Sequence, residues 1–465
     1  MDNLILDTDS YKASHFLQYP HGTSAMFSYI ESRGGRFDRT VFFGLQYILK
    51  KYMTQRVTTE MAHEADAFFR AHGEPFPRDG WETIARELGG RLPIKIRAVP
   101  EGSIVPTHNV LMTIESTDAR VFWLVGWLET ALMRIWYPVI VSTQSYFIKQ
   151  DILAALEKSS YDPQNEIAFK LHDFGSRGVS SRETAEIGGA SHLVNFMGSD
   201  TVAGVWCANH FYHSDMAAYS IPAAEHATIT AWGKENEVDA YRNMLTQFAK
   251  PNALVACVSD SYDLENAVVN LWGSALRDAV IKSGATIVIR PDSGDPPTIV
   301  RRTLEQLDAA FGHSINSKGY RVLNHVRVIQ GDGIHQNSIR AILQHALEGG
   351  YSATNLAFGM GGALLQQVNR DTQKFAMKLS EVTIDGERIA VCKDPVTDSG
   401  KRSKAGRLDL IETARGLETI VVNGKLRDDR SVMRTVFQDG EVLVEDTLDE
   451  IRARVNETLR ERVAV

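Results

Sequence analysis

The chain has 465 residues, with 50 lysines and arginines against 58 aspartates and glutamates, which gives a net charge of −8 at pH 7. Hydrophobic residues make up 43% and charged residues 23% of the chain, so a largely disordered protein is excluded. At roughly 100–200 residues per domain, two or three domains are expected. An acidic chain lacks the basic surface that nucleic acids require, so we expect no nucleic-acid partner.

The cysteines indicate a reducing compartment. Cys207, Cys257 and Cys392 form no C-x-x-C pair, which excludes a disulfide framework and a thiolate zinc site on spacing. The N-terminal residues 1–7 have acidic flanks around a short apolar run, so they do not form a secretory signal. We therefore predict a cytoplasmic protein.

Residues 122–142 form the one membrane-like stretch. It contains Glu129, Arg134 and Pro138, and each charge would cost about 2.5–3.5 kcal/mol at the centre of a bilayer. We predict a buried helix here and no membrane partner.

The two ends of the chain are typical of an α+β domain. Residues 94–98 alternate between apolar and charged side chains, and residues 109–115 form a second strand candidate. Near the C-terminus, Asn423-Gly424 and Asp439-Gly440 predict hairpins, and Thr447 with Glu450 predicts the start of a final helix. We expect residues 1–145 and 386–465 to form one domain together, and residues 146–385 to form the other.

The middle of the chain alternates apolar strands with helices, which favours an α/β barrel or a doubly wound sheet. Helices are predicted after Asp263 up to Gly284, over 300–311 and 339–347, and from a capping box of Ser180 and Glu183 to about Phe196. Eight strand candidates favour the barrel. They are Phe169–Asp173, Thr201–Val205, Ala217–Ile221, Ala253–Val258, Thr286–Arg290, Val326–Gln330, Asn355–Phe358 and Phe375–Leu379.

Polar and glycine-rich loops follow most of these strands, where barrels hold their active sites. Gly331-Asp332-Gly333 and Gly359-Met360-Gly361-Gly362 each lie between a strand and a helix. Glycine allows backbone N–H groups to approach an anion, so the pair predicts a phosphate monoester site. The alternative is that both loops are tight turns in which glycine supplies a positive φ.

Three further segments are candidates for chemistry. Arg290 directly follows a buried strand and needs a carboxylate or phosphate partner, which a bound substrate or Asp292 could supply. His226 has the chemistry of a proton shuttle or a nucleophile toward phosphorus, although a lone histidine is more often structural. The basic residues between 393 and 407 form either a phosphate grip or a solvated surface.

The chain resembles the type II phosphoribosyltransferases, and among them the nicotinamide phosphoribosyltransferase family, over nearly its full length. The matching segments include Thr8-Asp9-Ser10-Tyr11-Lys12, residues 41–49, 171–181, 200–204, 220–233, 258–263, 289–294, 329–333 and 401–408. The resemblance implies an irregular α/β barrel beside an α+β domain, in a homodimer whose active site lies at the subunit interface. It also implies that nicotinamide and 5-phosphoribosyl 1-pyrophosphate are joined, with Mg²⁺ as cofactor and ATP as co-substrate.

The resemblance also implies a role for individual residues. Phe174 and the partner's Tyr11 would stack on the pyridine ring, with Asp200 accepting the carboxamide N–H and Arg177 contacting the carboxamide or a phosphate. His226 would be phosphorylated by ATP, and Arg290 and Asp292 would contact the ribose-phosphate region. Asp260 and Ser261 would lie near the metal. The remaining candidates would bind the phosphoribosyl group or phosphates: Asp9, Arg33, Gly331, Asp332, Gly361, Gly362, Arg370, Lys378, Lys393 and Lys401.

Asp200 separates the nearest alternatives. A carboxylate accepts a hydrogen bond from an amide but repels nicotinate, at about 4 kcal/mol for charges 4 Å apart in an effective dielectric of 20. We therefore predict a preference for nicotinamide, with nicotinate phosphoribosyltransferase as the alternative activity and a non-catalytic barrel as the alternative of another class. The chain departs from the family pattern at Met360, where a small residue is expected, and at Ala363, where a further glycine is usual. The segment after Arg33 is shorter than in longer members of the family.

Overall fold

The computed structural model describes residues 3–397, 402–422 and 430–463. The chain divides into two compact units. Unit 1 comprises Met1–Thr143, His210–Ser214 and Asn369–Val465, and unit 2 comprises Gln144–Asn209 and Asp215–Val368. The predicted hairpin at Asn423-Gly424 and the candidate Lys401 lie outside the described residues.

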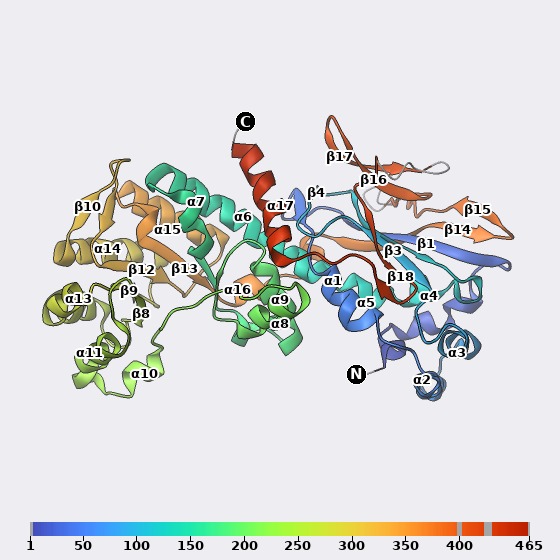
Figure 1. Cartoon of the computed structure of the whole chain (residues 1–465), viewed down its shortest axis with the longest axis horizontal. Helices are drawn as coiled ribbons and strands as arrows, with labels where there is room; N and C mark the ends of the chain where they lie inside the picture. The colour runs from blue at the N-terminus through green and yellow to red at the C-terminus, as the bar shows by residue number, and fades with distance from the viewer. Residues whose placement is uncertain (1–2, 398–401, 423–429, 464–465) are drawn as a thin grey trace. The chain divides into compact units, whose positions relative to one another are not determined.

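Unit 2 is built on a six-stranded parallel sheet with the strand order β7-β6-β13-β12-β9-β8. Helices α14 and α15 pack side by side, as Figure 1 shows. The strands are β6 (Leu171–Asp173), β7 (Gly198–Ser199), β8 (Leu254–Val258), β9 (Thr286–Arg290), β12 (Val326–Gln330) and β13 (Leu356–Met360), with β10 (His313–Ile315) and β11 (Arg321–Leu323) in a separate hairpin. The helices are α7 (Pro163–Glu166), α8 (Arg182–His192), α9 (Val202–Phe211), α10 (His226–Thr230), α11 (Glu237–Phe248), α12 (Leu264–Asn266), α13 (Arg277–Ser283), α14 (Pro296–Phe311), α15 (Gln336–Glu348) and α16 (Gly362–Leu365).

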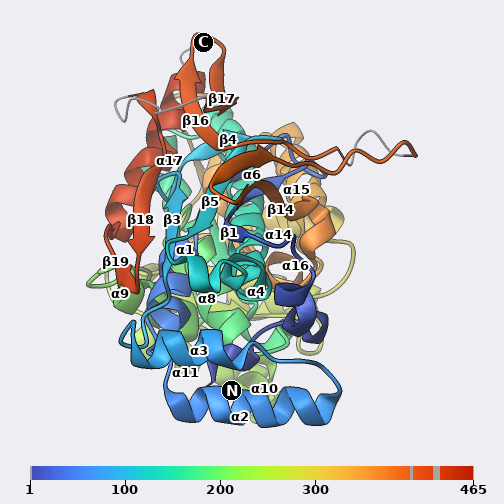
Figure 2. The ribbon, with the colours of Figure 1, turned by 90° about the vertical axis from the view of Figure 1, so that its right-hand side faces the viewer.

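Unit 1 is built on a seven-stranded sheet with the order β15-β14-β1-β5-β3-β18-β19, in which every pairing is antiparallel. Figure 2 shows α2 and α3 together at one end of this unit. The strands are β1 (Thr23–Ser32), β2 (Arg39–Val41), β3 (Ile94–Ala98), β4 (Ile104–Pro106), β5 (Val110–Ser116), β14 (Phe375–Ile384), β15 (Glu387–Ala390), β16 (Leu408–Thr413), β17 (Gly416–Val421), β18 (Arg434–Gln438) and β19 (Glu441–Val442). The helices are α1 (Leu45–Ile48), α2 (Thr59–His72), α3 (Arg78–Arg86), α4 (Leu124–Trp127), α5 (Glu129–Met133) and α17 (Leu448–Val463), while α6 (Trp136–Ser159) passes from unit 1 into unit 2.

The expected fold class is confirmed: the chain has an α/β unit with a parallel sheet and an α+β unit to which both ends contribute. Strand β1 from the N-terminal part pairs with β14, and β3 pairs with β18. The Asp439-Gly440 hairpin is also confirmed, since both residues have a positive φ (49° and 83°), as a two-residue turn of this kind requires.

The expectation of eight barrel strands is wrong at three places. Thr201–Val205 begins helix α9, where Gly204 packs so closely on Gly189 of α8 that a Cβ would stand 2.5 Å from the Gly189 Cα. Ala217–Ile221 makes only an isolated bridge, from Tyr219 to Gly198. Phe375–Leu379 belongs to β14 and pairs with β1 in unit 1, because an antiparallel strand satisfies its apolar pattern equally well.

Three helix predictions also change in detail. The cap of α8 is Ser181, whose hydroxyl accepts the Thr184 N–H, and not Ser180. The helix after Asp263 is interrupted by a π-helical segment, Ala267–Ala275, although Gly284 ends it as expected, with a φ of 67°. The stretch 122–142 forms α4, α5 and the start of α6 rather than one helix. None of the helices in the described chain is long and apolar enough to cross a membrane.

Candidate active site

A cavity of about 690 Å³ in unit 2, here called the strand-end pocket, lies at the carboxyl ends of the parallel strands. The pairing register brings these ends together, since Asp173 pairs with both Met360 and Ser199, and Val258 pairs with Arg290. The lining residues come from the loops that follow β6, β7, β9, β12 and β13 and from the start of α10: Phe174, Ser176, Arg177, Gly178, Asp200, Thr201, Glu225, His226, Ala227, Arg290, Asp292, Gly331, Gly361 and Gly362.

Phe174 and Asp200 are fixed to each other through the backbone of Asp173. The Phe174 N–H donates to the Met360 carbonyl oxygen at 3.0 Å, and the Asp200 N–H donates to the Asp173 carbonyl oxygen at 2.9 Å. The Phe174 ring packs against an apolar floor that includes Ala256. The pocket therefore offers an aromatic face beside a carboxylate.

The carboxylates around this aromatic face differ in their surroundings. Asp173 is fully buried, and burial raises the pKa of its carboxyl to about 6, while the Gly175 N–H, 2.7 Å from Asp173 Oδ1, acts in the opposite direction. Asp200 is exposed, and its Oδ1 accepts a hydrogen bond from the Ser220 hydroxyl at 2.5 Å. Asp200 is thus the carboxylate available to a ligand, and Ser220 orients it.

His226 is the first residue of α10 and is held by Asp260. His226 Nε2 lies 3.0 Å from Asp260 Oδ1, and the Asp260 side chain is only 5% exposed, whereas the His226 side chain is 46% exposed. The buried carboxylate fixes the ring and leaves the rest of it open to the pocket. This is the arrangement of a histidine with an orienting acid.

Arg290 and Asp292 form a loose pair in the same pocket. Arg290 Nη2 lies 3.5 Å from Asp292 Oδ2, and the buried Arg290 Nε has no hydrogen-bond partner among the described residues. Burial raises the pKa of Asp292, Arg290 opposes this shift, and Asp260 and Asp332 add to it. A guanidinium with an unused donor is suited to bind an anion.

The glycines of the two loops that line the pocket do not have a left-handed backbone. Only Gly333 has a positive φ (66°), whereas Gly331, Gly361 and Gly362 do not. A Cβ on Gly331 would stand 3.1 Å from Asp292 Oδ1, and one on Gly362 would meet nothing within 4 Å. Met360 ends β13 with its side chain buried, so its size does not obstruct the loop.

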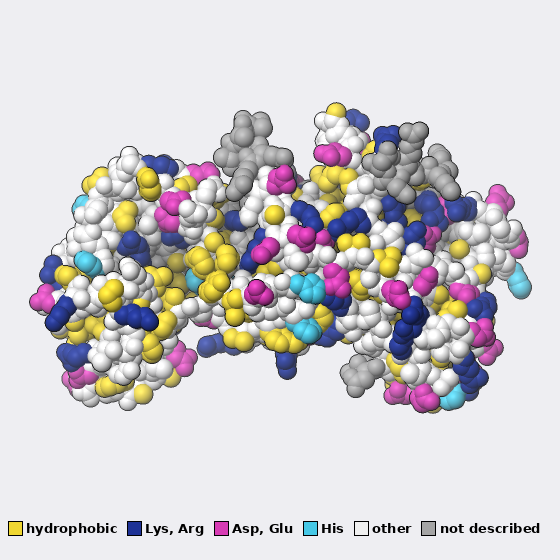
Figure 3. Space-filling model, in the orientation of Figure 1, with side chains coloured by type: hydrophobic (Ala, Val, Ile, Leu, Met, Phe, Trp, Pro, Cys, Tyr) yellow, Lys and Arg dark blue, Asp and Glu magenta, His cyan; other side chains and the backbone are white. Residues whose placement is uncertain are grey.

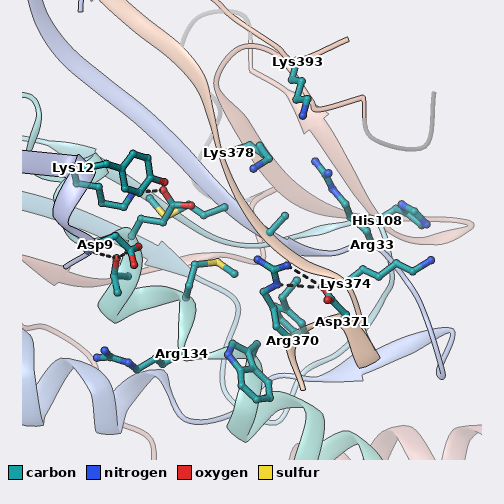
Figure 4. A pocket seen from close by; sticks show the side chains of 18 residues that line it. Asp9, Lys12, Arg33, His108, Arg134, Arg370, Asp371, Lys374, Lys378 and Lys393 are labelled. Carbon is teal, nitrogen blue, oxygen red and sulfur yellow. Dashed lines mark hydrogen bonds and ion pairs between the residues drawn. The ribbon is translucent and has the colours of Figure 1, made fainter. Parts of the chain in front are cut away.

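A second cavity, the cationic pocket, lies wholly within unit 1 and has a volume of about 820 Å³ (Figure 4). It is lined by the ends of β1 and β14, by α5 and by neighbouring loops. Its polar side chains are Asp9, Tyr11, Lys12, Arg33, His108, Glu129, Thr130, Arg134, Arg370, Asp371, Lys374, Lys378 and Lys393. Burial lowers the pKa of Lys378, and Arg33, Lys393 and Arg370 lower it further, so the fold gathers mutually repelling cations.

The structure thus distributes the predicted residues over two pockets. Nine line the strand-end pocket: Phe174, Arg177, Asp200, His226, Arg290, Asp292, Gly331, Gly361 and Gly362. Six line the cationic pocket: Asp9, Tyr11, Arg33, Arg370, Lys378 and Lys393. Asp260, Ser261 and Asp332 line neither, although Asp260 contacts His226.

Several lining residues were not singled out from the sequence. Thr201 and Glu225 stand beside predicted residues, and their position next to Asp200 and His226 was the available signal. His108 and Lys374 have no comparable motif, because their place depends on the pairing of distant strands.

The described residues contain no group of three or more His, Cys, Asp or Glu side chains that could hold a metal ion. The charges of Asp260 and Asp332 nevertheless lie near enough to Asp292 to raise its pKa, so carboxylates gather beside the pocket. Magnesium keeps several water ligands and is commonly held by one or two carboxylates and substrate phosphates. The pocket therefore fits a magnesium ion that arrives with a phosphorylated substrate.

A parallel sheet with this pocket, combined with an antiparallel-sheet unit, is the architecture of the type II phosphoribosyltransferases. Structures with this fold include nicotinate-nucleotide pyrophosphorylase from Pyrococcus furiosus (TM-score 0.63, 17% identity, covering 99% of this chain and 97% of that one). The structure of human nicotinic acid phosphoribosyltransferase is also similar (TM-score 0.57, 15% identity, covering 97% of this chain and 93% of the human one).

Sequence comparison places the chain within a family. Residues 169–441 match the nicotinate phosphoribosyltransferase (NAPRTase) family, and residues 3–96 match the nicotinamide phosphoribosyltransferase N-terminal domain. The nicotinamide phosphoribosyltransferase of Xanthomonas campestris pv. campestris is 58% identical over 463 residues, covering 98% of both chains. The nicotinamide phosphoribosyltransferase of Acinetobacter baylyi is 30% identical, and the match covers 97% of this chain and 96% of the Acinetobacter protein. The chain belongs to the NAPRTase family, in the group that carries the nicotinamide phosphoribosyltransferase N-terminal domain.

Proposed function

We propose that this protein joins nicotinamide to 5-phosphoribosyl 1-pyrophosphate, which yields nicotinamide mononucleotide and pyrophosphate for NAD salvage. The observation that carries the proposal is that Phe174 and Asp200 line the same cavity as Arg290 and the glycine loops. An aromatic face beside a carboxylate suits a neutral pyridine amide, and a guanidinium beside backbone N–H groups suits a phosphorylated sugar. The similarity to nicotinamide phosphoribosyltransferases supports this substrate over nicotinate.

The reaction makes one bond and breaks one. The pyridine nitrogen forms a bond to the anomeric carbon, while the bond from that carbon to the pyrophosphate oxygen breaks and its electron pair leaves with pyrophosphate. Phe174 and Asp200 would hold the nucleophile in line, and Arg290 would stabilise negative charge near the ribose phosphates. Asp260, Asp292 and Ser261 would hold Mg²⁺ together with the substrate phosphates, and the ion would neutralise charge on the leaving pyrophosphate.

We further propose that ATP phosphorylates His226. The bond from the γ-phosphorus to ADP breaks as a bond from that phosphorus to a ring nitrogen forms. With Nε2 donating its proton to Asp260, Nδ1 carries the lone pair that this attack requires. Asp260 would also stabilise the phosphorylated ring by holding the proton on Nε2.

We propose that the active protein is a homodimer in which Tyr11 and the cationic pocket of one protomer serve the strand-end pocket of its partner. Tyr11 is 58% exposed, as a residue with a partner in another chain would be in the isolated protomer. Val202, Met216 and Tyr219 in unit 2 are also strongly exposed, and Figure 3 shows hydrophobic side chains on this unit's surface. A contiguous patch of such side chains is typical of an interface. A cytoplasmic location remains our prediction from the free cysteines.

Product analysis tests the function. The purified protein should form nicotinamide mononucleotide and release pyrophosphate only when nicotinamide and the phosphoribosyl donor are both present, and ATP should stimulate the reaction. Equal turnover of nicotinate would contradict the proposed specificity, and release of pyrophosphate without the pyridine substrate would contradict the reaction.

A further inference from the structure

Two side chains of the cationic pocket, His108 and Lys374, have a backbone conformation that non-glycine residues rarely adopt. Their φ angles are 66° and 47°, in the left-handed region, which costs free energy for both residue types. Strain of this kind is concentrated at functional sites, where the surrounding structure enforces it. Both side chains line the pocket, and Figure 4 shows them on the side where Arg33 also lies.

The surrounding structure enforces both conformations through the end of β1. The His108 N–H donates to the Ser32 carbonyl oxygen at 2.7 Å, and the Arg33 N–H donates to the Lys374 carbonyl oxygen at 3.3 Å. The Gln373 side-chain oxygen accepts the Phe37 N–H at 2.7 Å, so the residue before Lys374 is held against the segment that follows Arg33. His108 therefore holds Ser32, the last residue of β1, and Lys374 holds Arg33, which follows it.

The charges around them are only partly balanced. Arg370 pairs with Asp371 at 3.1 Å, Lys12 pairs with Glu129 at 2.6 Å, and Arg33 Nε bonds Glu31 at 2.9 Å. Among the described residues, no acceptor bonds the buried Arg33 Nη2.

Lys374 adds to this positive charge, and His108 lies in the same pocket. In the described parts of the chain, neither side chain forms a hydrogen bond or an ion pair. Both side chains are exposed and line the pocket. An unpaired lysine ammonium and an imidazole with free ring nitrogens beside Arg33 give this side of the cavity donors suited to an anion from outside the chain.

We propose that Lys374 and His108 are further anion-binding residues of this pocket and contact a phosphate group of a polyphosphate chain alongside Arg33. The inference rests on the proposed function, since ATP and 5-phosphoribosyl 1-pyrophosphate both supply such a chain. On this proposal, the left-handed backbone at positions 108 and 374 positions both side chains for a ligand and does more than form a tight turn.

The left-handed backbone at position 374 allows charge and strain to be separated by substitution. Lys374→Gly removes the charge and relieves the strain, Lys374→Asn removes the charge with a residue that tolerates this conformation, and Lys374→Arg keeps the charge. Lys282→Asn, at an exposed position in the last turn of α13, is the matched control for loss of one positive charge. His108→Asn tests the second residue in the same way.

The measurement is calorimetric titration of the full-length protein with inorganic tripolyphosphate. We expect the Kd to rise about 5- to 20-fold in Lys374→Asn, Lys374→Gly and His108→Asn, and to change less than twofold in Lys374→Arg and Lys282→Asn. Unchanged binding in both Lys374→Asn and Lys374→Gly would overturn the proposal, and a higher Tm in Lys374→Gly would then assign the residue to the turn alone.

Steady-state kinetics of the same variants separate the two sources of phosphate. A rise in the KM for ATP alone would place Lys374 on the triphosphate, and a rise in the KM for the phosphoribosyl donor alone would place it on the pyrophosphate. If the wild-type protein forms nicotinamide mononucleotide but the charge-removing variants bind tripolyphosphate normally, this inference fails while the proposed function stands. If the wild-type protein binds tripolyphosphate but forms no product, the proposed function fails instead.

Discussion

The Phe174 ring lies against the backbone of Gly359, so closely that a Cβ at position 359 would stand 1.9 Å from Phe174 Cε2. Gly359 belongs to β13, and the residue after it, Met360, accepts the Phe174 N–H at 3.0 Å. The strand therefore fixes the backbone of Phe174 and leaves room for its ring at the same point. Glycine is required at position 359 for this close approach and not for a special φ, since its φ is not positive.

Gly359→Ala should therefore displace the Phe174 ring and weaken nicotinamide binding. A contact below 3.0 Å cannot persist, and overpacking of this kind costs typically 1–3 kcal/mol. We expect the KM for nicotinamide to rise about tenfold, equivalent to about 1.4 kcal/mol, with little change in the KM for the phosphoribosyl donor. A parallel rise of both KM values would show that the substitution disturbs the whole pocket instead. Phe174→Leu combined with Gly359→Ala serves as a control, since a smaller side chain removes the clash without restoring the aromatic face.

Asp200→Ser should relax the discrimination between nicotinamide and nicotinate. The substitution removes the negative charge that repels nicotinate and leaves Ser220, which donates to Asp200 Oδ1 at 2.5 Å, without its acceptor. Because Asp200 is exposed, solvent weakens the repulsion, and we expect the ratio of kcat/KM for the two bases to fall about 10- to 100-fold. Competition between the two bases measures the ratio directly. Ser220→Ala keeps the carboxylate and should change the ratio much less; an unchanged ratio in Asp200→Ser would remove Asp200 from this role.

The strand-end pocket could be predicted in large part because its residues follow the strands directly. A buried apolar run followed by a polar or glycine-rich loop places Phe174, Arg290 and Gly331 at one edge of a parallel sheet, whatever the exact strand count. The error at Phe375–Leu379 did not affect these residues. That segment was assigned to the wrong sheet because its apolar pattern fits a parallel and an antiparallel strand alike.

The cationic pocket was less accessible to prediction, because it depends on pairing between distant segments. Arg33 directly follows strand β1, which pairs with β14, where Lys378 lies opposite Tyr29. Local pattern cannot specify such a partner, so His108 and Lys374 had no signal of their own. Arg33, Arg370 and Lys378 were named only through the family resemblance, whereas Lys393 also belongs to the basic run that predicts a phosphate grip.

His226→Ala should abolish ATP stimulation and leave the basal joining reaction measurable. The imidazole is the proposed phosphate acceptor, whereas Phe174 and Asp200 act on the other substrate. Radioactivity from γ-labelled ATP should be retained on the wild-type protein and lost from the variant. Asp260→Asn keeps the hydrogen bond to Nε2 but removes the charge, so we expect partial loss of labelling, roughly 10-fold in rate. Full ATP stimulation of His226→Ala would exclude the phosphohistidine.

Glu101 should make unit 1 less stable as the pH rises. Its carboxylate is buried and accepts the N–H groups of Gly44 at 3.0 Å and Gln46 at 2.6 Å, yet burial, with a contribution from Asp446, raises its pKa to about 7. A carboxyl with a pKa above its unfolded value binds more protons in the folded state, so the free energy of unfolding falls as the pH rises from about 4.5 toward about 7. Glu101→Gln removes this titration and keeps one acceptor oxygen. Urea unfolding at pH 5.5 and pH 8 should show that the wild-type protein loses roughly 1–3 kcal/mol more than Glu101→Gln between the two values. Equal losses in both proteins would mean that the backbone donors keep Glu101 ionised throughout this range, and that its burial is compensated by hydrogen bonds alone.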